Sequence, residues 1–145
     1  MFAHSFEPVL KHRKRVEENL QRELSALEKS LADEKRKLLG YKSRIGEISA
    51  ELKQAQKKGS PVSDISVYLS FIQQLSRDIT AQEKKVFEAG THMELKRRDL
   101  IEATQRKKAL EKLKEKQMSA QKQALQKKEQ AFLDETGIHQ FNKNH

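Results

Sequence analysis

The chain has 145 residues, a net charge of +9, 35% charged residues, 6% aromatic residues and no cysteine. Without cysteine there is no disulfide framework, thiolate metal site or cysteine nucleophile, and we expect an intracellular protein. No apolar run reaches the roughly 18 residues of a membrane-spanning helix, and residues 1–10 lack the long apolar stretch of a signal peptide.

Residues 1–57 are predicted to form a first helix. Ser5 is expected to cap it, with Pro8 in the first turn, where a missing N–H is harmless. From Leu20 onward the apolar residues are stepped alternately by four and three, which is the roughly 3.5-residue repeat of a coiled-coil seam. One charged residue, Glu34, interrupts it. The seam positions are Leu20, Leu24, Leu27, Leu31, Glu34, Leu38, Tyr41, Ile45, Ile48, Leu52 and Ala55.

The segment 58–63, Lys-Gly-Ser-Pro-Val-Ser, is the predicted turn. Ser63 or Asp64 is expected to cap a second helix over residues 64–135, and Gly137 is expected to stop it. Residues 136–145 are predicted to be a disordered tail. The second seam is formed by Ile65, Tyr68, Ile72, Leu75, Ile79, Gln82, Val86, Ala89, Met93, Lys96, Leu100, Ala103, Lys107 and Leu110.

A short loop between two helices makes them antiparallel neighbours. The predicted fold class is therefore all-α, a long antiparallel two-helix coiled-coil hairpin with the second helix longer than the first. Residues whose numbers sum to about 121 then face each other, as Ile48 and Ile72 do. Residues 117–131, about 20 Å of helix at 1.5 Å per residue, have no partner within the chain. Both termini are expected at this end of the rod, and the turn at the other.

Nothing in this pattern favours catalysis. The five histidines have no metal-ligand partner at i+3 or i+4, and Gly40 and Gly46 are one residue too far apart for a phosphate loop. A rod that buries one stripe has no enclosed pocket in which a nucleophile, a base and an orienting group could converge. We expect a protein that is not an enzyme, binds no cofactor or metal, and acts through its partners.

Three surfaces are candidates for partner contacts. The first is an i, i+4 pair just off the seam, Val67 and Phe71, which Leu75 extends. An exposed aromatic side chain is a good anchor when a partner offers a pocket. The alternative is that Phe71 folds over the edge of the seam and shields it.

The second surface is the basic end formed by residues 11–15 of the first helix and residues 106–112 of the second. Between Lys96 and Lys128 twelve Lys/Arg stand against four acids, a net charge of +8. Such a charge suits an acidic protein surface, nucleic acid or anionic lipid, and like charges brought together by both helices favour a docking site. A solvated charged face is the alternative.

The third surface is the unpaired end of the second helix. Met118, Leu125 and Phe132 lie seven residues apart on one face. An unpaired apolar stripe requires a partner helix or groove, unless the segment frays in solution.

Four stretches stand out when they are read together. They are the opening Phe6-x-x-Val9-Leu10-x-x-Arg13, then Tyr68-Leu69-Ser70-Phe71-Ile72-Gln73-Gln74-Leu75, then Arg97-Arg98-Asp99-Leu100-Ile101-Glu102-Ala103, and Arg106-Lys107-Lys108-Ala109-Leu110-Glu111-Lys112-Leu113. In order, length and turn position the chain resembles the FliJ family of flagellar export proteins over most of its length.

The resemblance implies a coiled-coil hairpin similar in shape to the central stalk of rotary ATPases. Such a protein would sit in the ring of the flagellar type III export ATPase and promote its assembly and activity. It would also contact the cytoplasmic domain of the membrane export gate and handle export chaperones. The implied location is the bacterial cytoplasm, peripheral at the inner face of the cell membrane.

By the same resemblance, two sets of residues would contact these partners. The export gate would be contacted by Phe71, Leu75 and Val67. The ATPase would be contacted by Leu10, Arg13, Lys14, Arg106, Leu110, Lys112 and Leu113.

Three alternatives stay open. The nearest alternative is the equivalent stalk of a virulence type III secretion system. Only the Tyr-x-x-Phe-Ile-x-x-Leu string favours the flagellar system over it. A basic nucleic-acid-binding coiled coil is permitted by the charge, but aromatic side chains do not interleave with the basic run. A membrane-surface amphipathic rod is disfavoured, because the basic overhang has small and polar residues where deep apolar anchors should be.

Overall fold

The structure, a computed structural model, describes residues 2–143, with side chains described for residues 6–138 and 141. In this part of the chain there are two helices and no strand: α1 (Phe2–Lys57) and α2 (Val62–Lys143). The chain divides into two units. We call residues 20–100 the hairpin unit, and residues 1–19 with 101–145 the terminal unit.

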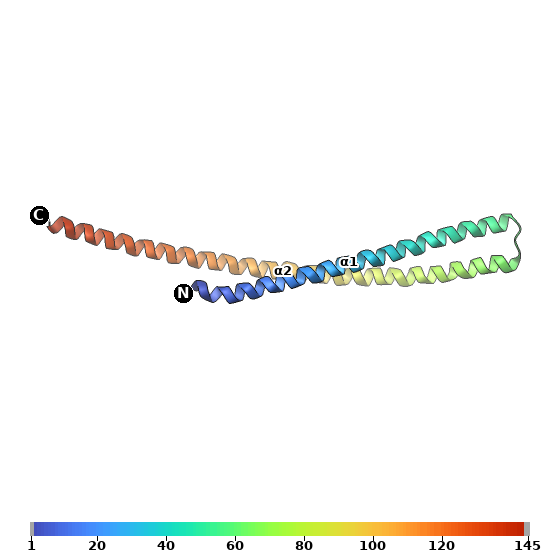
Figure 1. The fold of residues 1–145 in the computed structure, drawn as a ribbon, viewed down its shortest axis with the longest axis horizontal. Helices are drawn as coiled ribbons and strands as arrows, with labels where there is room; N and C mark the ends of the chain where they lie inside the picture. Colours follow the sequence, from blue (N-terminus) through green and yellow to red (C-terminus); the bar gives the residue numbers. More distant parts are fainter. Residues whose placement is uncertain (1, 144–145) are drawn as a thin grey trace. The chain divides into compact units, whose positions relative to one another are not determined.

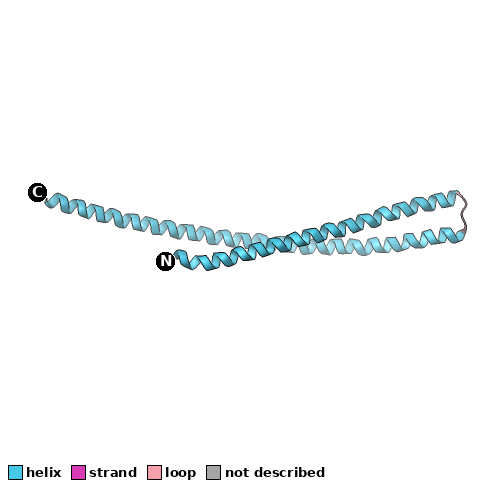
Figure 2. Ribbon diagram, viewed as in Figure 1, coloured by secondary structure: helices cyan, strands magenta, loops and turns pink. Residues whose placement is uncertain are grey.

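In the hairpin unit, α1 and α2 run side by side in opposite directions from the turn, which is green in Figure 1 and a pink loop in Figure 2. Each of its predicted seam positions is buried or half-buried, and the best-shielded apolar ones are Ile48, Ala55 and Leu75. The prediction of an all-α antiparallel hairpin with a longer second helix is confirmed.

The turn follows from one glycine. Gly59 has a φ of +70°, a left-handed conformation that a residue without Cβ adopts at little cost. The Ser60 N–H donates to the Ala55 carbonyl at 3.0 Å, and the Gly59 N–H donates to Gln56 at 3.2 Å. This is the Schellman motif, which satisfies the last carbonyls of α1.

The second helix begins earlier than expected. The Pro61 carbonyl accepts the N–H groups of Asp64 at 3.0 Å and Ile65 at 3.2 Å, so α2 begins at Val62. Ser63 and Asp64 therefore lie in its first turn and do not cap it. Asp64 still contributes there, since a carboxylate is favourable near the positive end of a helix dipole.

In the terminal unit, the first segment of α1 lies against α2, with Leu10 and Ala103 buried. The expected cap at Ser5 is wrong, because α1 already begins at Phe2 and contains Pro8. A proline this close to the helix start removes a single backbone hydrogen bond, and the helix passes through it.

The contacts between α1 and α2 agree with the expected pairing in both units. Their residue numbers sum to between 116 and 125, around the predicted value. The pairs are Glu34–Gln82, Glu23–Lys96 and Glu28–Arg97 in the hairpin unit, and Glu7–Lys114 and Glu17–Lys107 in the terminal unit.

Beyond Gln117, α2 has no helix beside it in the terminal unit, and residues 118–135 are all exposed. The predicted helix end at Gly137 is wrong. The predicted disordered tail is also wrong for residues 136–143, which belong to α2. The helix continues to Lys143, because Gly137 does not adopt the left-handed φ that ends a helix. The segment from Met118 to Lys143 is therefore about 39 Å of unpaired helix at 1.5 Å per residue, which we call the overhang. Neither helix has a window that is long and apolar enough to cross a membrane, in the part of the chain searched.

Candidate partner-binding surfaces

The surface around Phe71 lies on one flank of the hairpin unit. Phe71 directly precedes its seam residue Ile72, and 45% of its surface is exposed. The guanidinium carbon of Arg44, on α1, lies 5.7 Å from the centre of the ring, a cation–π distance. Arg44 thus steadies the ring at the edge of the seam while its outer part stays open to a partner.

The other two residues of the predicted gate surface differ from each other. Val67 is exposed, one turn before Phe71. Leu75 is only 6% exposed and belongs to the core between the helices. The structure therefore brings Val67 and Phe71 to a common surface, with Leu75 beneath it as a packing residue.

At the basic end, two lysines of α2 are paired with acidic residues of α1. Lys107 Nζ donates to Glu17 Oε1 at 2.9 Å, and Lys114 forms an ion pair with Glu7. The hydrogen bond from Lys107 is the main reason why the pKa of Glu17 is lowered, and the contact with Lys114 lowers the pKa of Glu7. The expected repulsion between like charges at Lys107 is wrong, because an acid on α1 faces this lysine.

The predicted ATPase residues fall into two groups. Leu10 is 7% exposed and Leu110 is half-buried, so these two leucines hold the terminal unit together. The others lie at the surface or its edge: Arg13, Lys14, Arg106, Lys112 and Leu113. A shallow groove of about 280 Å³ opens beside them, lined by Leu10, Lys14, Glu111, Lys114, Glu115 and Met118.

The overhang presents the third predicted surface. Met118, Leu125 and Phe132 are exposed, as the spacing predicts. Because the helix does not end at Gly137, Leu133, Ile138 and Phe141 add further exposed apolar surface. Exposed apolar side chains in this number on one segment mark it as a contact region.

A polar pair inside the seam escaped sequence reasoning. Gln82 is only 3% exposed, and its amide nitrogen donates to the Glu34 carbonyl oxygen at 2.9 Å and also to the Glu34 carboxylate. The latter bond is the main cause of the lowered pKa of Glu34. Both residues were assigned to the seam. Two polar side chains at seam positions that are otherwise mostly apolar were the signal from which their pairing could have been predicted.

No catalytic constellation emerges from this geometry. In the described residues no three His, Cys, Asp or Glu side chains lie close enough to hold a metal ion. The hollows are open grooves along helix flanks, such as the one at Leu10 and one beside Gly90 in the hairpin unit.

Comparison with known protein families matches residues 2–145 to the family described as "Flagellar FliJ protein". No curated protein and no solved structure matches the chain significantly. The family match covers essentially the whole sequence, and the two-helix architecture is the one that the resemblance implied. The chain therefore belongs to the FliJ family and is a component related to flagellar protein export.

Proposed function

We propose that the protein is a stalk and escort of the flagellar type III export apparatus. The terminal unit binds the export ATPase ring, and the Phe71 surface binds the cytoplasmic domain of the export gate. Empty export chaperones are further partners. These contacts hold the protein in the cytoplasm, at the inner face of the cell membrane, and it hydrolyses nothing itself.

The overhang is the observation that carries this proposal. A helix of about 39 Å with exposed apolar side chains is costly to leave in water, and a ring with a central opening would cover all of its faces. Next to it stands a basic surface that includes Lys14 and Lys112, both exposed. Charges at the rim of a contact speed association and fix its orientation.

The ATPase contact is tested by mixing the purified full-length chain with the export ATPase. We expect a complex and a higher rate of ATP hydrolysis. The double variant Lys14→Glu/Lys112→Glu should weaken the complex by about tenfold or more at low salt. A matched control, Lys53→Glu/Lys57→Glu, makes the same charge change at exposed lysines of the hairpin unit. Unchanged turnover with the wild-type chain, or equal losses in both variants, would count against the stalk role.

The gate contact is tested with Phe71→Ala. Because the ring is only partly covered, helix content should stay the same while binding to the gate domain falls by about tenfold or more. Leu39→Ala is the control, since Leu39 is an exposed apolar residue of α1 that belongs to neither flank surface. If gate binding survives and the helices melt at lower temperature, Phe71 shields the seam and is not an anchor.

A further inference from the structure

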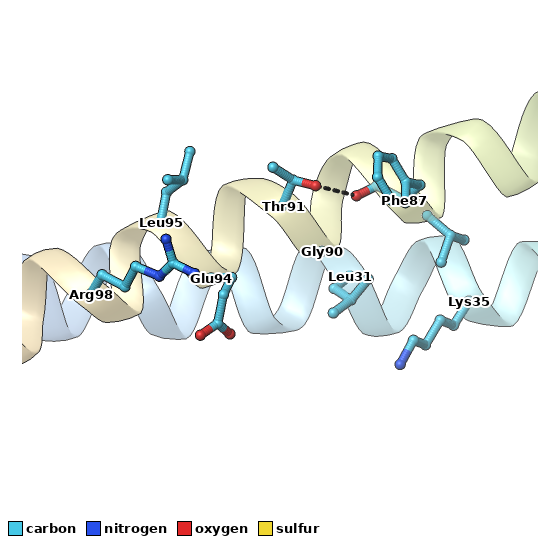
Figure 3. Close-up of a pocket in the computed structure, with 9 residues that line it drawn as sticks. Leu31, Lys35, Phe87, Gly90, Thr91, Glu94, Leu95 and Arg98 are labelled. Carbon is cyan, nitrogen blue, oxygen red and sulfur yellow. Dashed lines mark hydrogen bonds between the residues drawn. The ribbon is translucent and has the colours of Figure 1, made fainter.

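A second apolar surface lies on the hairpin unit, on the flank of α2 opposite Phe71. Phe87 and Gly90 directly follow their seam residues Val86 and Ala89, whereas Phe71 precedes its own. A groove of about 450 Å³ opens there (Figure 3). It is lined by Leu31 and Lys35 of α1 and by Val86, Phe87, Gly90, Thr91, Glu94, Leu95 and Arg98 of α2.

The walls and floor of this groove have distinct roles. Phe87 is 76% exposed and Leu95 is exposed two turns further along, so two large apolar side chains stand at the surface. Leu31 lines the groove from α1, and Gly90, on α2 between Phe87 and Leu95, forms its floor (Figure 3). The Thr91 hydroxyl donates to the Phe87 carbonyl at 3.0 Å, so this polar group is already satisfied within α2.

Gly90 is not explained by packing inside the chain. A Cβ added there would meet no atom within 4 Å, so alanine would fit. Glycine within a helix costs about 1 kcal/mol relative to alanine. The same is true of Gly40, Gly46 and Gly137, so Gly90 differs by its place in an apolar groove, where a missing side chain leaves room for a second molecule.

The charges at the rim of the groove indicate which charge the contacting side chains of that molecule carry. Lys96 and Arg97 reach across to Glu23 and Glu28 on α1. In contrast, Lys35 and Arg98 make no ion pair or hydrogen bond within the described residues, and they stand at opposite ends of the groove (Figure 3). The only acid at the rim, Glu94, is near Arg97 at 4.0 Å. The groove therefore offers two uncompensated positive charges.

We propose that this groove binds an amphipathic helix of another protein, with its apolar face on Phe87, Gly90 and Leu95 and acidic side chains beside Lys35 and Arg98. The groove follows α2 from residue 87 to residue 98, about 17 Å or three helical turns. A helix laid into a groove contacts it through residues at i, i+4 and i+7, which fits this length. A second copy of the chain is a poor occupant, because its net charge is +9.

The first experiment identifies what covers the groove. A photo-reactive benzoylphenylalanine is placed at position 87 of the full-length chain in cells, and at position 69 as a control. Leu69 is also exposed but lies outside the groove. We expect an adduct specific to position 87, whose cross-linked segment is an amphipathic helix with acidic flanks. No adduct, a basic or non-helical segment, lipid, or a second copy of this chain would overturn the proposal.

The second experiment measures the contact with a synthetic peptide of that segment and the full-length chain. Phe87→Ala should weaken binding by about tenfold or more, and Lys35→Glu/Arg98→Glu by about tenfold. Gly90→Ala should weaken it by about fivefold or more, although it makes the hairpin more stable. The control Gly40→Ala should raise stability without changing affinity, because Gly40 lies outside the groove. Unchanged affinity of Gly90→Ala would show that the partner does not approach the floor.

Discussion

The hairpin unit and the terminal unit use the same two helices but bury different chemistry between them. In the hairpin unit the seam is mostly aliphatic and holds the core residues Ile48 and Leu75. In the terminal unit Leu10 and Ala103 are the buried apolar residues, and Lys107 occupies a seam position with Glu17 as its partner. Farther along α2 there is no second helix at all.

This difference separates a part with a largely apolar seam from a part whose seam contains an ion pair and whose second helix outlasts the first. Apolar burial contributes about 25 cal/mol for each Å² removed from water, whereas an ion pair that is still partly open to water contributes less and is weakened by salt. The hairpin unit can therefore present its flank surfaces on a firm support. The terminal unit is weakly held in isolation, and the proposed ATPase contact would supply what its own seam lacks.

The largest difference in unfolding behaviour is expected between two variants that truncate similarly buried side chains, one in each unit. Ile48→Ala should lower the free energy of unfolding by roughly 2–4 kcal/mol, through lost burial and the cavity left behind. Leu10→Ala removes an equally shielded side chain from the terminal unit. There the loss should appear as local opening of residues 6–19. Urea unfolding monitored by circular dichroism, together with hydrogen exchange, distinguishes the two results.

Leu39→Ala is the control for both variants, because Leu39 is exposed and its truncation should change neither measurement. Equal shifts of the urea midpoint for Ile48→Ala and Leu10→Ala would mean that the two units unfold as one, and the comparison would be lost.

The second contrast concerns the polar pair within the hairpin seam. Gln82→Ala removes the hydrogen bonds that Glu34 accepts from inside the seam and leaves its carboxylate with the contact to Lys37, so it should lower the melting temperature. The double variant Glu34→Leu/Gln82→Leu should raise it, since apolar residues then fill the seam. A buried polar residue fixes register and oligomeric state in coiled coils, so the double variant should also form larger assemblies. Calorimetry and light scattering measure the two effects, and a double variant with the same mass in solution as the wild-type chain would assign the pair no role in specificity.

Much of the fold could be predicted from spacing alone. Alternating steps of three and four residues located the seam, because only that period keeps a stripe facing a partner helix. Gly59 with Pro61 located the turn. The ends were harder: Ser5 and Gly137 have the right residue types for a cap and a stop, but helices here continue through both. A cap depends on backbone dihedral angles that residue type only favours.

The candidate surfaces were predictable only in part. Exposure of Phe71 follows from its place beside the seam, whereas the Arg44 contact depends on which α1 residue lies opposite. The ion pair of Lys107 with Glu17 was missed for the same reason, since a shift of half a turn brings different charges together. The groove beside Gly90 was not predicted, because a groove has two walls and sequence spacing describes only one.

A smaller effect is expected from pH, and chiefly in the terminal unit. The pKa values of Glu7 and Glu17 lie below the ordinary 4.5 because lysines bind their ionised forms. This stabilisation is complete above about pH 5 and is lost as the pH falls through the lowered pKa values. The pKa of Lys107 is raised above 10.5, chiefly by its hydrogen bond to Glu17. The stabilisation from its ammonium group is therefore complete below about pH 10.5 and is lost as the pH rises through the raised pKa. Melting temperatures measured from pH 7 to pH 3 should fall, with residues 6–19 opening first.

Glu17→Gln sharpens this measurement. It should lower the stability of the terminal unit at pH 7 and flatten the dependence below pH 5, because glutamine does not titrate. An unchanged acid profile in this variant would show that the pair with Lys107 does not hold the first segment of α1 in place.

The smallest effects are expected at two glycines that differ only in their unit. A Cβ added at Gly40 or at Gly137 would meet no atom within 4 Å, so each alanine should gain up to about 1 kcal/mol of local helix stability. In the hairpin unit, Gly40→Ala should raise the urea midpoint, because its segment unfolds together with the seam. In the overhang, Gly137→Ala should leave the midpoint unchanged and slow hydrogen exchange only nearby, since a helix without a neighbour melts by itself. An equal rise of the midpoint for both variants would show that the overhang already has a partner in solution, which for a purified chain means self-association.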